Sequence, residues 1–212
     1  MKGLFITFEG IEGSGKTTQI QLLKKFFEKM GRSVVLTREP GGTEIGDKIR
    51  KVLLNPEFKN MAPLTELFLY AAARRQHIDQ VILPATQEGK IVLCDRYADA
   101  TVAYQGFGRK IDRKLLDKIH ILATDNLKPD LTLLLDCHAE TGLKRAIARE
   151  TEKNKPEDRF EKEALDFHQR VRNGYLQLAK EEPKRFCVIP ANDSVENISK
   201  KIIEIMERCL NF

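Results

Sequence analysis

The stretch Gly10-Ile11-Glu12-Gly13-Ser14-Gly15-Lys16-Thr17 matches the pattern Gly-x-x-x-x-Gly-Lys-Ser/Thr. An apolar run, residues 4–8, precedes it, and a segment with helical periodicity begins at Lys16. This context favours a phosphate-binding loop (P-loop) over a plain glycine turn, because the glycines let several N–H groups point inward and the helix adds its positive end. We therefore expect the loop to bind a polyphosphate, with Lys16 on the β- and γ-phosphates and the Thr17 hydroxyl on Mg²⁺.

The rest of the chain alternates short apolar runs with longer helical patterns. The runs that predict buried strands are residues 4–8, 33–37, 90–95, 131–136 and 186–190. The segments with helical periodicity are residues 16–30, 45–54, 64–83, 113–123, 141–149, 160–180 and 195–210. This alternation predicts an α/β fold whose parallel sheet carries helices on both faces. No repeat or Pro/Ser-rich linker divides the chain, so we expect a single domain over residues 1–212; the charged segment 150–158 predicts a solvated loop.

Composition limits the class of protein. The chain has 212 residues, 42% of them hydrophobic, and a net charge of +5. Its longest apolar run, residues 67–73, is far short of the roughly 20 residues of a membrane span, so we expect a cytoplasmic protein with no membrane partner. The four cysteines and four histidines lack metal-ligand spacing. A pI near 9.0 is compatible with nucleic acid, with phosphorylated small molecules or with neither.

Two predicted strands end in an aspartate that is a candidate for holding the water shell of the metal. Asp95 is favoured because Arg96 and Tyr97 follow it at the carboxyl end of a strand, where open α/β sheets bind ligands. For Asp136, a helix N-cap is an equally good interpretation. A P-loop alone leaves kinase, motor, switch and nucleic-acid enzyme open, so the remaining motifs must decide.

Those motifs carry a resemblance to a known family. They are the segments Phe8 to Thr18, Thr37-Arg38-Glu39-Pro40-Gly41-Gly42-Thr43, Tyr70-Ala71-Ala72-Ala73-Arg74, Asp95-Arg96-Tyr97, Ala103-Tyr104-Gln105-Gly106 and Pro129 to Asp136. Over essentially its whole length the chain resembles bacterial-type thymidylate kinases, P-loop nucleoside monophosphate kinases. The resemblance implies the P-loop NTPase fold with five parallel strands and a short lid at about residues 145–160. It also implies a homodimer, and transfer of the γ-phosphoryl of MgATP to dTMP, a step in dTTP synthesis.

The same resemblance implies a role for individual residues. The expected ATP-binding positions are Gly10, Ile11, Glu12, Gly13, Ser14, Gly15, Lys16, Thr17 and Thr18, and the expected metal positions are Thr17 and Asp95. The expected substrate-binding positions are Glu9, Glu39, Arg50, Tyr70, Arg74, Arg96, Thr101, Tyr104 and Gln105. Arg50 and Arg96 would bind the acceptor phosphate, and Arg74 and Gln105 the edge of the thymine ring.

The resemblance also implies roles for the remaining substrate-binding positions. Glu9 would contact the sugar of the acceptor and the metal-water shell. Tyr70 would stack on the thymine where many relatives have Phe, and Thr101 would face the base. Tyr104 is a hypothetical floor for the sugar, and Glu39-Pro40 resembles a pocket turn whose peptide bond can be cis.

The expected chemistry needs positioning and charge neutralisation more than a base. A phosphate monoester is largely dianionic at neutral pH, so it can attack without losing a proton. The expected catalytic residues are Lys16, Arg96 and Arg149. We expect Arg149, at the end of a predicted helix, to swing over the γ-phosphate when the lid closes, assisted by Arg145 or Arg159. A solvated charge near a helix end is the alternative interpretation of Arg149.

Three alternatives to dTMP phosphorylation stay open. Another nucleoside monophosphate kinase, acting on dUMP, UMP or CMP, would share the motifs. A regulatory switch would share the P-loop, and residues 154–157 superficially resemble a guanine-reading Asn-Lys-x-Asp, but with Glu last. A nucleic-acid-binding ATPase would need a contiguous basic stripe, whereas here the 36 basic residues are interspersed with 31 acids, so we expect no nucleic-acid partner.

Overall fold

The computed structural model describes residues 3–152, 159–160 and 162–210, and of residues 149–152 and 210 it describes the backbone only. The strands are β1 (Leu4–Glu9), β2 (Val34–Arg38), β3 (Ile91–Asp95), β4 (Leu131–Asp136) and β5 (Phe186–Pro190). The α-helices are α1 (Lys16–Lys29), α2 (Glu44–Leu54), α3 (Pro63–His77), α4 (Leu83–Gln87), α5 (Ala98–Thr101), α6 (Arg113–Thr124), α7 (Ala139–Glu152), α8 (Leu165–Glu181) and α9 (Val195–Leu210). Two π-helical segments continue α3 and α5, namely η1 (Ile78–Ile82) and η2 (Val102–Gly108).

The five strands form one parallel sheet in the order β2-β3-β1-β4-β5. β1 is central, and the chain crosses to its other side when it passes from β3 to β4. In open α/β sheets such a reversal of strand order leaves a crevice at the carboxyl ends of the strands, which is where ligands bind. The expected fold class, a five-stranded parallel sheet with helices, is confirmed.

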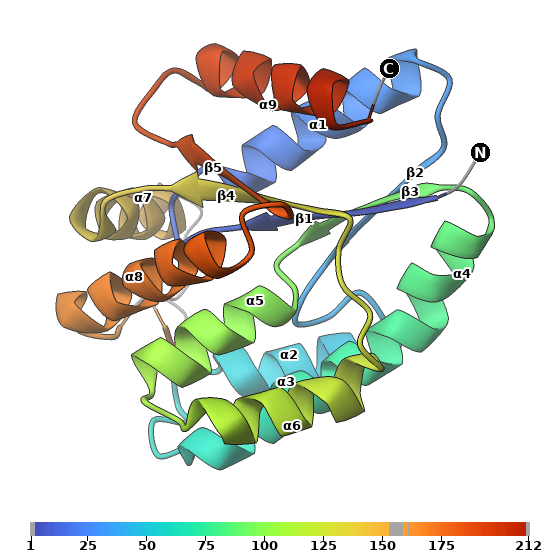
Figure 1. Cartoon of the computed structure of the whole chain (residues 1–212). Coiled ribbons are helices and arrows are strands. Elements are labelled where there is room, and N and C mark those ends of the chain that lie inside the picture. Colours follow the sequence, from blue (N-terminus) through green and yellow to red (C-terminus); the bar gives the residue numbers. More distant parts are fainter. Residues whose placement is uncertain (1–2, 153–158, 161, 211–212) are drawn as a thin grey trace.

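Helices cover both faces of the sheet (Figure 1), with α1 and α9 on one side and α8, α5 and the α2, α3, α6 group on the other. Successive side chains of β3 point to opposite faces. Ile91 and Leu93 pack in the main core, whereas Val92 and Cys94 pack in a second cluster with Ile78. Burial on both faces explains why the strands are continuous apolar runs rather than alternating patterns.

Two parts of the helical prediction are wrong. The segment 160–180 does not begin as a helix, because α8 starts at Leu165, and Phe160 lies in a turn with only 3% of its surface exposed. Tyr104 packs edge-on against the Phe160 ring, with centroids 5.5 Å apart, and this burial outweighs the local helical pattern. The sequence also did not predict the helical turns of α5 and η2, which follow β3 directly.

Within the part of the chain that the structure describes, none of the helices combines the length and the apolar character that a membrane crossing requires.

Candidate active site

The P-loop follows β1 and ends where α1 begins, as its sequence predicts. Gly10 and Gly13 adopt φ values of 134° and 67°, and Gly15, at the N-cap of α1, adopts 94°. Only glycine adopts these angles without strain. α7 lies against the loop so closely that a Cβ on Gly142 would stand 2.5 Å from the carbonyl oxygen of Glu12. The loop is therefore held in shape by its glycines and by a helix that is distant in the sequence.

Lys16 is the cation of this loop, and its side chain is almost wholly buried. Its Nζ donates hydrogen bonds to the carbonyl oxygens of Gly10, at 3.0 Å, and of Ile11, at 2.8 Å. Burial, reinforced by the positive charge of Arg96, lowers the pKa of Lys16 to about 8, although Asp95 acts in the opposite direction. The ammonium is thus desolvated and lies where a bound polyphosphate would compensate its charge.

Of the two candidate aspartates, Asp95 reaches the P-loop. Thr17 Oγ1 donates a hydrogen bond to Asp95 Oδ2 over 3.3 Å. Asp136 instead accepts two hydrogen bonds from Arg172, at 2.7 and 2.9 Å. Since α7 begins only at Ala139, the interpretation of Asp136 as its N-cap is wrong.

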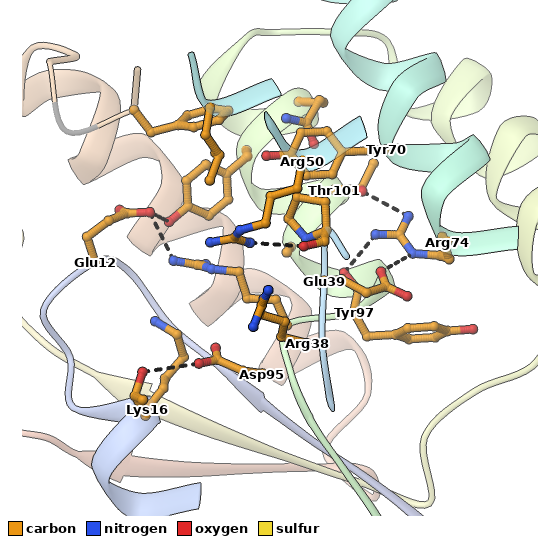
Figure 2. A pocket seen from close by; sticks show the side chains of 18 of the residues that line it. Glu12, Lys16, Arg38, Glu39, Arg50, Tyr70, Arg74, Asp95, Tyr97 and Thr101 are labelled. Atoms are coloured by element: carbon orange, nitrogen blue, oxygen red, sulfur yellow. Dashed lines mark hydrogen bonds and ion pairs between the residues drawn. The ribbon is translucent and has the colours of Figure 1, made fainter. Parts of the chain in front are cut away.

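A pocket opens beside this loop (Figure 2). Its walls come from the ends of β2 and β3, from α2, α3, α5 and η2, and from Phe160. The predicted site residues that line it are Glu12, Gly13, Lys16, Thr17, Glu39, Arg50, Tyr70, Arg74, Asp95, Arg96, Thr101, Tyr104 and Gln105. The pocket therefore joins residues from five of the six motifs that carried the resemblance.

Arg96 lies at the middle of the pocket and is held from several sides. Its Nη1 donates hydrogen bonds to the carbonyl oxygen of Gly10, at 2.9 Å, and to the Tyr175 hydroxyl, at 3.1 Å. Its Nη2 contacts Glu12 Oε1 at 2.9 Å, and the guanidinium carbon lies 4.8 Å from the centroid of the Tyr104 ring. Its backbone has a φ of 72°, an unusual value for a side chain of this size. The guanidinium is thus preorganised beside the P-loop.

Glu12 is the acidic partner in this arrangement. Burial opposes its ionisation most strongly, but the charge of Arg96, a hydrogen bond with His168 and the charge of Lys16 together outweigh burial and hold the pKa of Glu12 well below its ordinary value. Its Oε1 also accepts a hydrogen bond from the Tyr104 hydroxyl over 2.6 Å. Glu12 therefore links the P-loop to both the cation and the aromatic ring of the pocket.

Glu9 does not take the position that the sequence led us to expect. Its side chain is fully buried behind the pocket wall, and its oxygens accept hydrogen bonds from the Tyr97 backbone N–H, at 2.7 Å, and the Tyr175 hydroxyl, at 2.8 Å. Burial, reinforced by the negative charge of Asp99, raises the pKa of Glu9 to about 8. Glu9 is therefore not among the residues that line the pocket.

The opposite end of the pocket is built around Arg74, which is 2% exposed. Its Nε donates to Glu39 Oε2 over 2.7 Å, its Nη1 to Thr101 Oγ1 over 3.0 Å, and its Nη2 to the Tyr97 carbonyl oxygen over 3.1 Å. Figure 2 shows the guanidinium between Glu39 and Thr101. The Glu39-Pro40 peptide bond is cis, as the turn motif permits. The turn after β2 and the segment that contains α5 thus fix one buried guanidinium.

Arg50 and Tyr70 also line the pocket. Arg50 Nη1 donates to the carbonyl oxygen of Pro40 over 2.9 Å. The Tyr70 ring lies 6.4 Å from that of Phe160, centroid to centroid. Together they form an aromatic and cationic rim between the two ends of the pocket.

The sequence predicts most of the wall residues but not all of them, and one residue that it predicts cannot be placed. It assigned no role to Arg38, Tyr97 or Phe160, although all three line the pocket. Arg38 and Tyr97 belong to the motifs that carried the resemblance, whereas Phe160 had no local signal. Arg149 lies in α7, but its side chain falls outside the described residues.

Comparison with known proteins decides the family. The family model described as thymidylate kinase matches residues 8–202. The chain belongs to the thymidylate kinase family. It is 54% identical to the thymidylate kinase of Pelobacter propionicus over 99% of this chain and 96% of that one, and 52% identical to the thymidylate kinase of Geobacter sulfurreducens over 96% of each. The crystal structure of thymidylate kinase from Ehrlichia chaffeensis superposes with a TM-score of 0.78 at 34% identity, covering 97% of this chain and 100% of that chain.

Proposed function

We propose that this chain is a thymidylate kinase that transfers the γ-phosphoryl of ATP to dTMP, giving ADP and dTDP. The observation that carries the proposal is one pocket with the P-loop and Asp95 at one end and the buried, fully oriented Arg74 at the other. Family membership supports the same activity. ATP supplies the phosphoryl group at the first end, and the base of dTMP occupies the second.

The donor phosphates bind in the P-loop, which comprises residues 10–18. Its inward N–H groups and the N-terminus of α1 hold the phosphate oxygens, and Lys16 leaves its backbone partners to bridge the β- and γ-phosphates. The low pKa of Lys16 means that ATP binding restores the fully charged ammonium.

Mg²⁺ is the metal that these residues fit. Thr17 and Asp95 offer a hydroxyl and a carboxylate within 3.3 Å of each other, and hard oxygen ligands are what Mg²⁺ prefers. Among the described residues no three His, Cys, Asp or Glu side chains group together, so the remaining ligands would be phosphate oxygens and water. When bound, the ion would neutralise charge on the transferring group.

The acceptor binds across the middle and far end of the pocket. Arg96 and Arg50 grip its phosphate, for which the planar guanidinium is suited. Tyr70 stacks on the thymine, Tyr104 lies under the sugar, and the base edge meets Arg74 and Gln105. Thr101 and Glu39 act by holding Arg74, as their hydrogen bonds indicate. Glu9 acts indirectly, because it holds the Tyr97 backbone and the Tyr175 hydroxyl that contacts Arg96.

Phosphoryl transfer then requires alignment. An oxygen of the acceptor phosphate forms a bond to Pγ while the bond from Pγ to the β–γ bridging oxygen breaks, and ADP leaves with that electron pair. No base is needed for the dianionic acceptor. Arg149, carried by a lid at about residues 145–160 of this single domain, completes the charge around Pγ on closure. Of the two residues expected to assist, Arg145 is the one we propose; Arg159 is buried against Glu66, which argues against that role.

The activity test is a coupled assay of ADP release with dTMP, dUMP, UMP, CMP and AMP. We expect dTMP to be turned over fastest. Faster turnover of any other monophosphate would reject the thymidylate assignment in favour of the alternative nucleoside monophosphate kinase.

We also propose a cytoplasmic homodimer. Large apolar side chains are exposed on α3 and α6, which pack against each other on the side away from the sheet (Figure 1). Phe68 on α3 is 56% exposed and Leu122 on α6 is 79% exposed. A second copy of this chain would cover these side chains, since exposed apolar patches commonly mark interfaces.

A further inference from the structure

A carboxylate lies behind the wall of the pocket, where no ligand reaches it. Glu66, on α3, is 0% exposed and does not line the pocket. Its Oε1 accepts a hydrogen bond from Gln105 Nε2 over 2.7 Å, and Gln105 does line the pocket. A buried side chain thus touches one of the residues that meet the base.

Two guanidiniums keep this carboxylate charged. Arg109 donates to it through Nε and Nη2, both at 3.3 Å, and Arg159 Nη2 forms an ion pair with Glu66 Oε2 at 2.6 Å. A buried carboxylate with two such partners keeps its charge, because the pairing compensates for the loss of water. An ionised carboxylate only accepts hydrogen bonds.

The charge on Glu66 decides which way the amide of Gln105 points. A primary amide has a donor NH₂ on one side and an acceptor oxygen on the other. Because Glu66 can only accept, Gln105 must turn Nε2 toward it. Its Oε1 is then the atom that meets a ligand in the pocket.

We propose that Glu66 is a positioning residue that fixes Gln105 as a hydrogen-bond acceptor and so selects a base whose ring nitrogen carries a proton. This inference rests on the proposed function, because it concerns the base of the acceptor. Thymine and uracil have an N3–H donor, whereas cytosine has an unprotonated N3. A cytosine would place its N3 lone pair against Gln105 Oε1, leaving two acceptors face to face.

Arg74 adds the same preference at the neighbouring position of the base. Three of its N–H groups are donated to Glu39, Thr101 and Tyr97, and a guanidinium carries five. The remaining donors suit the carbonyl at C4 of thymine and oppose the amino group of cytosine. Gln105, which Glu66 orients, therefore presents an acceptor on the pocket wall, and Arg74 presents donors beside it.

The same cluster connects base recognition to the end of the lid. Arg159 and Phe160 are the last residues of the expected lid, and the guanidinium carbons of Arg159 and Arg109 lie 4.8 and 5.6 Å from the centroid of the Phe160 ring. Arg159 also donates through Nε to the carbonyl oxygen of Leu53 over 3.0 Å. The residue that orients Gln105 is thus held by the segment through which the lid returns to the domain.

The test compares kcat/KM for dTMP and dCMP in the wild type and in Glu66→Gln. The new amide can donate to Gln105, which frees Gln105 to flip and offer its NH₂ to cytosine. We expect the dTMP:dCMP ratio to fall by about tenfold or more, the range of one mismatched hydrogen bond. A ratio that stays within about twofold of the wild type, in a folded variant, would overturn the proposal.

Two further variants separate orientation from stability. Arg109→Gln removes one guanidinium but leaves Glu66 against Gln105, so it should lower the melting temperature while keeping the dTMP:dCMP ratio. The exchange Glu66→Gln with Gln105→Glu keeps the charge of the cluster and again presents an acceptor to the base. It should recover the ratio that Glu66→Gln loses, and a folded exchange variant without recovery would contradict the mechanism.

A measurement on the wild type decides the matter if these variants do not fold. The Gln105 Nε2 protons should exchange slowly with solvent before any nucleotide is added, because they are donated to Glu66. Fast exchange would overturn the assigned orientation. Failure of the proposed function is distinguishable: a wild type that does not phosphorylate dTMP rejects that function, while calorimetric binding of dTMP and dCMP to wild type and Glu66→Gln still tests the role of Glu66.

Discussion

The Arg96 guanidinium is joined to the Glu12 carboxylate by a contact of 2.9 Å between Nη2 and Oε1. This pair connects the loop that we propose holds the donor to the cation that we propose binds the acceptor phosphate. An acid at this point of a phosphate site would repel ligands if it were alone. Because Arg96 compensates it, Glu12 serves to orient the guanidinium instead.

Arg96→Lys should therefore fail to conserve activity. Lysine keeps the charge, but it cannot stack on Tyr104 and bind both Glu12 and a phosphate with a planar fork. We expect kcat/KM for dTMP to fall by about 10²-fold or more. Steady-state ADP release measures the loss, with Arg208→Lys on the exposed surface of α9 as the control. Near-wild-type kinetics for Arg96→Lys would show that charge alone is sufficient.

Glu9 should make stability depend on pH. Its pKa in the folded protein is about 8, above the ordinary value of 4.5, so between these pH values the folded state holds a proton that the unfolded chain has lost. Stability from this group is lost as pH rises through that window, by an amount on the order of a few kcal/mol. Glu9→Gln cannot lose the proton. The melting temperature of Glu9→Gln minus that of the wild type should increase from pH 5 to pH 8.5. A difference that stays constant would contradict the raised pKa of Glu9.

Lys16 should make ATP binding weaker as the pH rises from 7 to 9. In the free protein its pKa is lowered to about 8, so the ammonium is lost as pH rises through 8, while bound triphosphate favours the charged form. We expect ATP affinity to fall by about tenfold from pH 7 to pH 9, which is the change in the charged fraction. Calorimetry in two buffers should also show proton uptake near pH 8. Lys16→Met should bind ATP weakly at both pH values. If its ATP affinity depended on pH as strongly as that of the wild type, another group would be responsible for the effect.

Gly142→Ala should damage ATP binding from outside the loop. The added methyl would stand 2.5 Å from the carbonyl oxygen of Glu12 and 2.8 Å from Ile11 Cδ1, so the P-loop or α7 must move. We expect KM for ATP to rise by about tenfold, even though alanine is the better helix former. Thr141→Ala, one residue earlier on α7, is the matched control. Equal kinetics for the two variants would show that the loop tolerates the shift.

The homodimer should depend on the apolar surface of α3 and α6. Leu122→Glu places a charge on the most exposed of these side chains, and burying it in an interface would be costly. We expect wild type to sediment as a dimer and Leu122→Glu as a monomer. Met30→Glu, 45% exposed at the end of α1, should remain dimeric. A monomeric wild type would reject the dimer itself.

The class of fold and one end of the site could be predicted from the sequence because they depend on local chemistry. Buried parallel strands must be apolar on both faces, and a loop that wraps phosphate must have glycine at positive φ, as at Gly10 and Gly13. Such requirements can be recognised in a few consecutive residues of the sequence. The motif around Asp95 likewise marked the end of β3 and the acid that faces Thr17.

The tertiary structure alone decided which polar groups are buried and what they touch. Gln105 and Glu66 are 39 residues apart in the chain, and no pattern in either segment predicts their hydrogen bond. Glu9 was expected at the pocket wall, but packing against Tyr97 and Tyr175 buries it. Phe160 was expected in a helix, but it packs against the Tyr104 ring and lines the pocket. Desolvation and the pairing of distant charges depend on the whole packed chain, and those are the forces that orient the side chains of this site.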